Sequence, residues 1–280
     1  MTFNTTENKG LFPDVTSIEP VQAIPDALIF TLAQNAGVIK GDSQTARIAY
    51  VSDDADADYY KEGAKIEAKA PQVSELIVPT KKIAIVTVAS NEAYGNDGVP
   101  GLLSKSLQNS IIKKADRAFL SEAAPAEGTV GTTGLANLTG LADGGTLTDS
   151  LDPFIDAIAT CSQNGGTPST IVMGFDSWAY LLKLKDKNGR AFIGADVANS
   201  ATPVLFGLPV VLNGQAAAGT ALVLDTTQIL CSHGNIELAV SEDAFFSNDA
   251  TGVRVTFRFG FGVTRPNRIV KIKVGATANN

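Results

Sequence analysis

The chain has 280 residues, of which 44% are hydrophobic and 18% charged, and its formal net charge is −7. This balance is typical of a folded globular protein and excludes a disordered or low-complexity chain. The acidic balance argues against tight nonspecific binding to nucleic acid, which requires a basic surface. The apolar runs are far shorter than the roughly 20 residues of a membrane-spanning helix, and the N-terminus lacks the pattern of a signal peptide. We therefore expect a protein without a membrane segment that folds in a cytoplasm.

The N-terminal third combines a polar arm with two strands. Residues 1–25 are polar and carry three prolines, which predicts an irregular N-terminal arm, and the apolar segment 24–38 is compatible with a short helix that anchors it. Strands are expected at 46–52 and 76–90. The stretch between them, 53–75, is polar. Folded as a hairpin with legs of about eleven residues, it would reach roughly 35 Å, as far as a small domain is wide.

A long helix is expected after the second strand. From Pro100 to Ala123 apolar residues recur at every fourth position, which predicts one buried helix face. The apolar positions are Leu103, Leu107, Ile111, Ala115 and Phe119, with Ile112 and Ala118 beside them. At about 1.5 Å per residue this helix would be about 36 Å long, the length of a structural spine. A Gly/Thr-rich loop is expected at 126–146.

The rest of the chain first alternates helix with strand and then becomes β-structure. The expected elements are a helix at 152–161, a strand at 170–175, a helix at 176–186, and strands at 206–213 and 220–230. Asp176 or Ser177 would cap the second helix. In the tail, Arg254, Thr256 and Arg258 alternate with apolar residues, which predicts a strand with one buried face. A similar strand is expected at 269–274.

The residues that could carry catalysis do not converge. His233 is the one histidine, so any Ser-His-Asp or Cys-His arrangement would have to use it, and its place after an apolar strand is typical of a turn residue. Cys161 and Cys231 are too far apart in sequence for the usual zinc spacing, and we expect both to be buried free thiols. We therefore expect no enzyme activity, no cofactor and no metal site.

Two stretches imitate binding motifs without completing them. Asp54, Asp56 and Asp58 resemble the start of a calcium loop, but Tyr59 and Lys65 occupy the positions that require glycine and glutamate. The sequence GTVGTTG at 128–134 lacks the Lys-Ser/Thr of a phosphate-binding loop. We interpret the first stretch as a solvated acidic face and the second as a flexible loop.

A series of weak motifs occurs in a fixed order along residues 10–275. They are EGAKIE (62–67), VASNEA (88–93), KADRAFL (114–120), TTGL (132–135), WAYLLKLKDKNGR (178–190), FGLPVV (206–211) and VRVTFRFGFGV (253–263). In this order and spacing they resemble the major capsid protein of tailed bacteriophages, whose fold is shared with encapsulin shell proteins.

The resemblance implies an α+β fold of the phage major-capsid type. Its parts would be an N-terminal arm, an extended β-hairpin loop, a peripheral domain with a long spine helix, and an axial α/β domain. The implied boundaries are 1–45 for the arm, 46–90 for the extended loop and its base strands, 91–147 plus 236–280 for the peripheral domain, and 148–235 for the axial domain. In this family the extended loop lies across the neighbouring subunit, so the polar hairpin would be covered by another copy.

The charges of two distant segments support such a contact. Residues 53–75 hold seven acids against three lysines, whereas residues 250–280 hold six bases and no acid. An acidic loop and a basic tail on one subunit allow a head-to-tail contact between copies, and such contacts close into rings. The predicted interface residues are Asp54, Asp56, Asp58, Lys61, Glu62, Lys65, Glu67, Arg254, Arg258, Arg265 and Arg268. The alternative is that both segments are solvated faces without a partner.

The function that the resemblance implies is that of a structural subunit. Copies would self-assemble as pentamers and hexamers into the icosahedral shell that encloses the double-stranded DNA of a tailed phage. The implied partners are the chain itself, a portal, a separate scaffolding protein and weakly, nonspecifically contacted DNA, with no membrane. The location would be the virion capsid, and the host cytoplasm during assembly. Two alternatives stay open: an encapsulin-like nanocompartment shell, and a small-molecule-binding α+β domain with a deep polar pocket.

Overall fold

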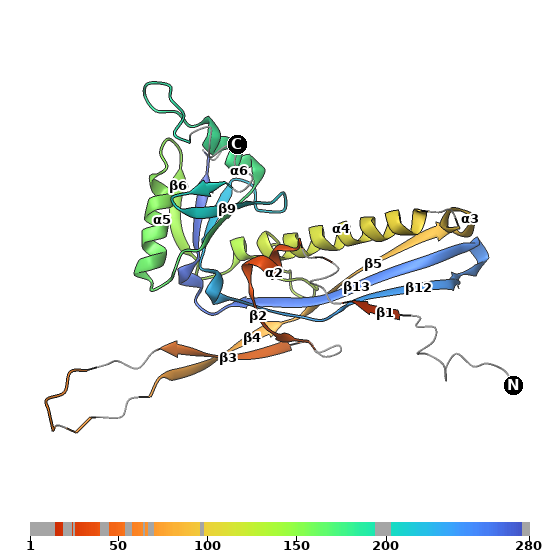
Figure 1. Ribbon diagram of the computed structural model, residues 1–280, viewed down its shortest axis with the longest axis horizontal. Coiled ribbons are helices and arrows are strands. Elements are labelled where there is room, and N and C mark those ends of the chain that lie inside the picture. The colour runs from red at the N-terminus through yellow and green to blue at the C-terminus, as the bar shows by residue number, and fades with distance from the viewer. Residues whose placement is uncertain are drawn as a thin grey trace.

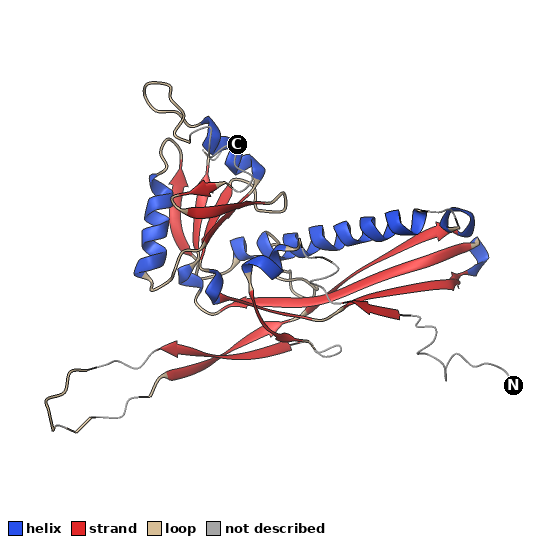
Figure 2. Ribbon diagram, viewed as in Figure 1, coloured by secondary structure: helices blue, strands red, loops and turns tan. Residues whose placement is uncertain are grey.

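The computed structural model describes residues 15–18, 24, 26–39, 45–53, 58–63, 65–66, 70–95, 98–193 and 203–275. Figure 1 shows three parts: a long layer in which helix α4 lies along a sheet, a lobe at one end of this layer, and an arm that projects from beneath it. Figure 2 shows that the lobe combines helices with a sheet, whereas the arm contains strands and loop. We call these parts the peripheral layer, the axial lobe and the arm.

The peripheral layer is organised around one 14-residue strand, β13 (Ala250–Val263). On one edge of β13, two strands lie end to end and antiparallel to it. Strand β12 (Ile236–Phe245) pairs with the first half of β13, and β11 (Ile229–His233) pairs with the last five residues. On the other edge lies β5 (Lys81–Ser90), also antiparallel. Because β13 pairs with three strands, it is the axis of this sheet.

The N-terminal elements close the same sheet. Strand β1 (Val15–Ile18) pairs antiparallel with β12, and β2 (Gln34–Val38) pairs parallel with β11. Between them stands α2 (Leu28–Leu32), where Ile29 and Leu32 are buried. The segment compatible with a short helix thus contains one turn of helix followed by a strand.

Helix α4 covers one face of the sheet, and the apolar stripe expected along it is confirmed. Its bounds are Val99–Leu120, and it follows β5 through the short helix α3 (Asn91–Tyr94). The buried positions of α4 include Leu107, Ile111, Ala115, Ala118 and Phe119. The Phe119 ring meets the Phe261 ring of β13 edge-on, with centroids 4.9 Å apart. Burying each such ring stabilises the fold by about 2–3 kcal/mol, so the stripe holds helix and sheet together.

The axial lobe contains a second six-stranded sheet, in the order β6-β14-β10-β7-β9-β8. The strands in this order are β6 (Ala142–Leu147), β14 (Val270–Val274), β10 (Thr220–Leu224), β7 (Thr170–Met173), β9 (Leu208–Leu212) and β8 (Val204–Leu205). Helices α5 (Asp152–Gln163) and α6 (Phe175–Lys183) pack against it around a core that includes Phe154, Met173 and Leu181.

The two sheets divide the chain differently from the expected boundaries. Strands β6 and β14 belong to the axial sheet, although 91–147 and 236–280 were assigned to the peripheral domain. Strand β11 belongs to the peripheral sheet, although it falls within 148–235. Boundaries drawn along the sequence miss these strands because pairing assigns them to their sheets: β6 and β14 pair with each other, and β11 pairs with β13.

The strand expected at 220–230 is in fact two strands in two sheets. Asp225 ends β10, since its Oδ1 accepts a hydrogen bond from the Thr227 N–H and its Oδ2 one from the Thr167 N–H, both 3.1 Å long. These bonds build the turn Thr226–Gln228, after which β11 enters the peripheral sheet. The chain also passes between the two parts after α4 and after β13, three times in all.

Three expectations for the axial lobe are corrected. The Gly/Thr-rich loop ends in strand β6, in which a Cβ on Gly144 would lie 2.7 Å from Ile272, so glycine is required there. The strand expected at 206–213 begins with a turn between β8 and β9. Helix α6 has no side-chain cap, because the Asp176 carboxylate instead accepts a hydrogen bond from the Gly219 N–H at 2.7 Å.

Candidate intersubunit interface

The arm is a two-stranded ribbon that continues into an exposed loop. Strand β3 (Thr45–Asp53) pairs antiparallel with β4 (Gln72–Pro79), and β4 leads into β5 at the buried residue Thr80. Figure 1 shows the ribbon crossing beneath β13 and projecting away from the body. In the described part of the loop beyond it, Tyr59 is fully exposed and Ile66 is 72% exposed. The loop therefore contributes large side chains that its own body does not cover.

The outer face of the ribbon is also uncovered. Val51 and Val73 pair across the strands, and Ile77 lies on the same face; their exposed fractions are 39%, 68% and 54%. An ion pair of Arg47 with Glu75, 3.4 Å long and exposed, separates these apolar residues. Exposed ion pairs contribute less than about 1 kcal/mol, so the face is held by its backbone ladder and offers apolar area to a partner.

The inner face of the ribbon seats on two glycines of β13. A Cβ on Gly260 would lie 2.6 Å from the Pro79 carbonyl oxygen, and one on Gly262 would lie 3.0 Å from Leu76. Neither glycine has a positive φ, so close approach of the arm explains them, as is usual for glycine inside a strand. Val78 of the ribbon is fully buried at this crossing.

An arginine bonds the ribbon where its ladder is irregular. The β3–β4 register shifts between Val51 and Asp53, a bulge that removes backbone groups from regular pairing. Arg265 Nη2 donates to the Val51 carbonyl at 2.8 Å and to the Ser52 carbonyl at 3.3 Å. The guanidinium thus joins the bulge to the segment that follows β13.

Four of the seven predicted interface residues of the loop lie among the described residues. Asp58, Lys61, Glu62 and Lys65 are all exposed, as an intersubunit role requires. Asp54, Asp56 and Glu67 lie outside the described residues.

The four predicted arginines differ in their surroundings. Arg254 is exposed on the outer face of β13, between Val86 of β5 and Ala239 of β12. Arg258 donates to Thr80 at the arm root, and Arg268 Nε donates to the Asn164 carbonyl at the end of α5, 2.9 Å away. Together with Arg265, these two have partners in their own chain. Whether any of the four also contacts a second copy stays a prediction.

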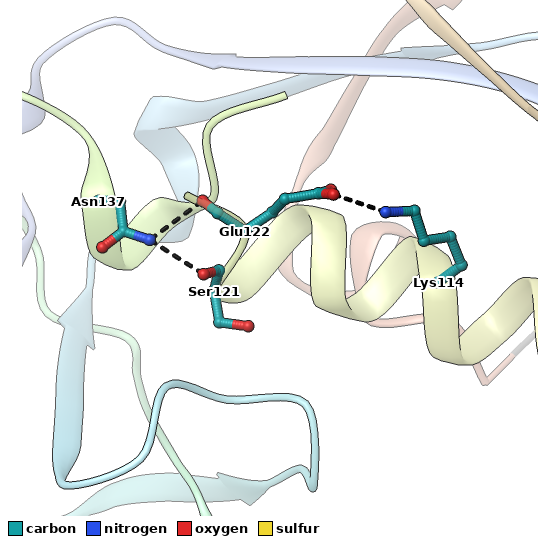
Figure 3. Close-up of polar contacts among 4 residues, drawn as sticks. All are labelled: Lys114, Ser121, Glu122 and Asn137. Atoms are coloured by element: carbon teal, nitrogen blue, oxygen red, sulfur yellow. Dashed lines mark hydrogen bonds and ion pairs between the residues drawn. The ribbon is translucent and has the colours of Figure 1, made fainter. Parts of the chain in front are cut away.

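Polar contacts fix the C-terminal end of the spine helix α4. Figure 3 shows Asn137 Nδ2 donating to the Ser121 and Glu122 carbonyls, at 2.9 and 3.0 Å, and Glu122 paired with Lys114. The Gly134 N–H donates to the same Glu122 carbonyl at 2.8 Å. Ser121 and Glu122 directly follow the last residue of α4, so these donors anchor the following loop to the helix end.

A buried carboxylate joins the spine helix to two other elements. Asp116 Oδ1 accepts from the Leu28 N–H of α2, and its Oδ2 accepts from Asn213 Nδ2 after β9, both at 2.8 Å. Burial raises the pKa of the Asp116 carboxyl above its ordinary value of 3.8, while the two hydrogen bonds act in the opposite direction. Asp116 therefore links peripheral layer and axial lobe through one side chain.

The other candidate binding features are modest. A cavity of about 420 Å³ lies between the η1 turn (Leu135–Asn137) and strands β6 and β14, but Lys271 Nζ, in its lining, already donates to the Ala136 carbonyl. Both thiols are buried, and burial raises the pKa of Cys161 and of Cys231 to about 11. Among the described residues, no cluster of metal-ligating side chains occurs and no helix is long and apolar enough to cross a membrane.

Sequence reasoning missed Asp116 and the two seat glycines. Asp116 carried a signal, because it lies between Ala115 and Phe119 within the apolar stripe of α4. Gly260 and Gly262 carried another, since glycines alternate with phenylalanines in an otherwise continuous strand. The role of Arg265 carried none, because its two carbonyl partners lie more than 200 positions away in sequence.

Comparison with known proteins identifies this architecture. The model of the phage capsid family matches residues 29–274, which is most of the chain. The chain belongs to the phage capsid family. It is thus a structural shell protein, a major capsid protein of the virion, and the resemblance seen in the sequence is confirmed. The family favours neither the encapsulin-like shell nor the small-molecule-binding domain.

Solved structures share the capsid fold at low sequence identity. A chain from Gordonia phage Cozz has 20% identity and a TM-score of 0.71, over 89% of this chain and 87% of that one. The capsid of a native GTA particle has 16% identity and a TM-score of 0.70, over 89% of this chain and 90% of that one. A chain from Mycobacterium phage Adephagia has 13% identity and a TM-score of 0.68, over 99% of each chain. Comparison with curated protein sequences gives no match. At these identities the structural likeness supports the fold, and the family model supports the capsid role.

Proposed function

We propose that copies of this capsid protein form pentamers and hexamers of an icosahedral shell by laying each arm across the neighbouring subunit. The observation that carries the proposal is the arm itself. It contacts its own body at the root and at the bulge of β3, while the side chains of Val73, Ile77 and Ile66 are more than half exposed. Covering one such side chain stabilises a contact by about 1–2 kcal/mol, so several together favour assembly over the isolated subunit.

The charge of the arm and of β13 supports the direction of this contact. Residues 53–75 hold seven acids against three lysines, and Arg254 is exposed on β13. Charges of this kind fix the register of a contact and speed encounter more than they add affinity. In the proposal the acidic loop of one subunit therefore approaches the basic outer face of the next.

Finer features belong to the same proposal. The shell encloses the double-stranded DNA of a tailed phage, and the net charge of −7 keeps contacts with that DNA weak. A portal and a separate scaffolding protein take part, assembly takes place in the host cytoplasm, and the subunit catalyses no reaction.

Removal of the arm loop tests the proposal. Replacing residues 54–71 by Asn-Gly closes the Asp53–Gln72 pair with a two-residue turn and leaves the ribbon and body in place. Wild-type protein should elute as megadalton particles that electron microscopy shows as closed shells, and the shortened variant should stay a folded monomer. A wild-type chain that stays monomeric at high concentration, or normal shells from the shortened variant, would contradict the proposal.

A further inference from the structure

Arg265 contacts the arm of its own subunit. Its guanidinium reaches across more than 200 residues of sequence to two consecutive carbonyls of β3. Both carbonyls lie at the β-bulge, the point where the ladder with β4 is irregular. A bulge bends its strand and increases the local twist, so this is the point at which the direction of the ribbon changes most easily.

The backbone around Arg265 is itself anchored to the body. Just before it, the Thr264 N–H donates to the Gln228 carbonyl at 3.0 Å, and Thr264 Oγ1 donates to Gln228 Oε1 at 2.8 Å. Just after it, the turn Pro266–Arg268 is held by the Arg268 bond to Asn164. The guanidinium is therefore a donor on a fixed base, and a carbonyl bound to it takes a fixed position relative to the body.

Gly260 and Gly262 of β13 supply a second contact with the same ribbon. Leu76 and Val78 rest on Gly262 and Gly260, close to the root, whereas Arg265 bonds β3 near its far end. Two separated contacts determine a direction, while one alone would allow the ribbon to pivot. The seat fixes where the arm leaves the body, and the guanidinium fixes where it points.

We infer that Arg265 is a positioning residue that clamps the bulge of β3 and thereby sets the direction of the arm in the shell. This inference rests on the proposed function, because arm direction matters where the arm must reach a neighbour. Arg265 would then act within its own subunit, in contrast to the intersubunit pairing expected from charge alone. The Arg265 clamp determines which neighbour positions the arm can reach, and so the curvature of the contact.

The test compares Arg265→Gln with Arg265→Lys and with the matched control Arg117→Gln, which removes the same charge from the exposed face of α4. Hydrogen exchange is measured on unassembled subunits over Thr45–Asp53 and Gln72–Pro79. Arg265→Gln should exchange about tenfold faster at the bulge end of the ribbon, because a hydrogen bond from a charged donor is lost. Arg265→Lys, whose single ammonium replaces the fork, should be intermediate, and the control should match wild type.

Two further measurements complete the experiment: the melting temperature of the subunit and the diameter of its particles. The melting temperature of Arg265→Gln should match that of the control, and its particles should be fewer or uneven in diameter by electron microscopy. Unchanged exchange in Arg265→Gln, normal shells, or loss of the folded body would each overturn the positioning role. If wild type itself formed no particles, the proposed function would fail, whereas the exchange measurement would still decide the clamp.

Discussion

At the scale of single residues, Asp116 is a buried carboxylate that connects two other elements of the subunit. One carboxylate oxygen serves α2 and the other serves the loop after β9, so both are satisfied although the side chain is 3% exposed. An aliphatic residue at this position could accept neither hydrogen bond and would leave both donors without this acceptor. The cost of burial appears in the raised pKa, since desolvation outweighs the two hydrogen bonds.

The raised pKa fixes the sign of a pH dependence. Between its ordinary pKa of 3.8 and the raised value, Asp116 holds more proton in the folded than in the unfolded chain, so its contribution to the free energy of unfolding grows as pH falls. Asp116→Asn lacks this contribution, and its amide N–H₂ would face one of the two groups that donate to the carboxylate, the Leu28 N–H or Asn213 Nδ2. We expect it to destabilise the subunit by about 1–3 kcal/mol, and by more at about pH 5 than at about pH 8.

Urea unfolding of unassembled wild type and Asp116→Asn at both pH values provides the measurement. Asp143→Asn, an exposed carboxylate on β6, is the control and should show little penalty at either pH. A penalty for Asp116→Asn that shrinks as the pH falls would show that the carboxylate is not held at a raised pKa.

At the scale of elements, the seat of the arm on β13 depends on the absence of two side chains. Gly260→Ala places its Cβ 2.6 Å from the Pro79 carbonyl oxygen and 3.1 Å from the Thr80 Cα, which are backbone atoms that cannot rotate away. The ribbon must therefore shift, and we expect a loss of about 1–3 kcal/mol in the free energy of unfolding together with fewer closed shells.

Gly214→Ala is the matched comparison for this prediction, because its Cβ meets nothing within 4 Å and its φ is not positive. Chemical denaturation measures both variants, and particle yield after assembly measures the effect on the arm. Equal penalties at Gly260 and Gly214 would mean that the arm does not press on β13.

The elements also show what could be predicted from sequence and what could not. The stripe of α4 and the alternation of β13 were visible because helix and strand periods place their apolar residues on one face. The change of sheet at Asp225 was not visible, since 220–230 is apolar on both sides of it and the redirecting bonds include one to Thr167. The arm loop was recognised by its charge, whereas the bonds of Arg265 to the bulge of β3 join residues that only the folded chain brings together.

At the scale of the whole molecule, one charge can separate intersubunit pairing from folding. Reversing Arg254 and Arg258 together would be ambiguous, because Arg258 donates to Thr80 at the root of its own arm. Arg254 is exposed, and the described part of the chain offers its side chain no hydrogen bond or ion pair. We therefore expect Arg254→Glu to fold and melt as wild type but to give fewer particles.

Each Arg254 contact is worth about 0.2–1 kcal/mol, and the effect accumulates because every subunit of the shell repeats it. Particle yield by size exclusion at low and high salt measures it, with Lys105→Glu on the exposed face of α4 as the control. The wild-type yield should fall with salt while the Arg254→Glu yield depends less on it. Wild-type yields from Arg254→Glu at low salt would remove this arginine from the contact.

The three passages of the chain between the axial lobe and the peripheral layer have a practical consequence for engineering. Neither part is a continuous piece of sequence, because the peripheral sheet takes strands from before β6 and from after β10, and the axial sheet takes β14 from beyond β13. A foreign module therefore cannot replace either part by exchange of one segment, and neither part can be expressed alone as one segment. Insertions are better accepted at an exposed turn such as Asp186–Arg190, whose ends are already joined by a 2.7 Å backbone hydrogen bond, so that displayed cargo leaves both sheets intact.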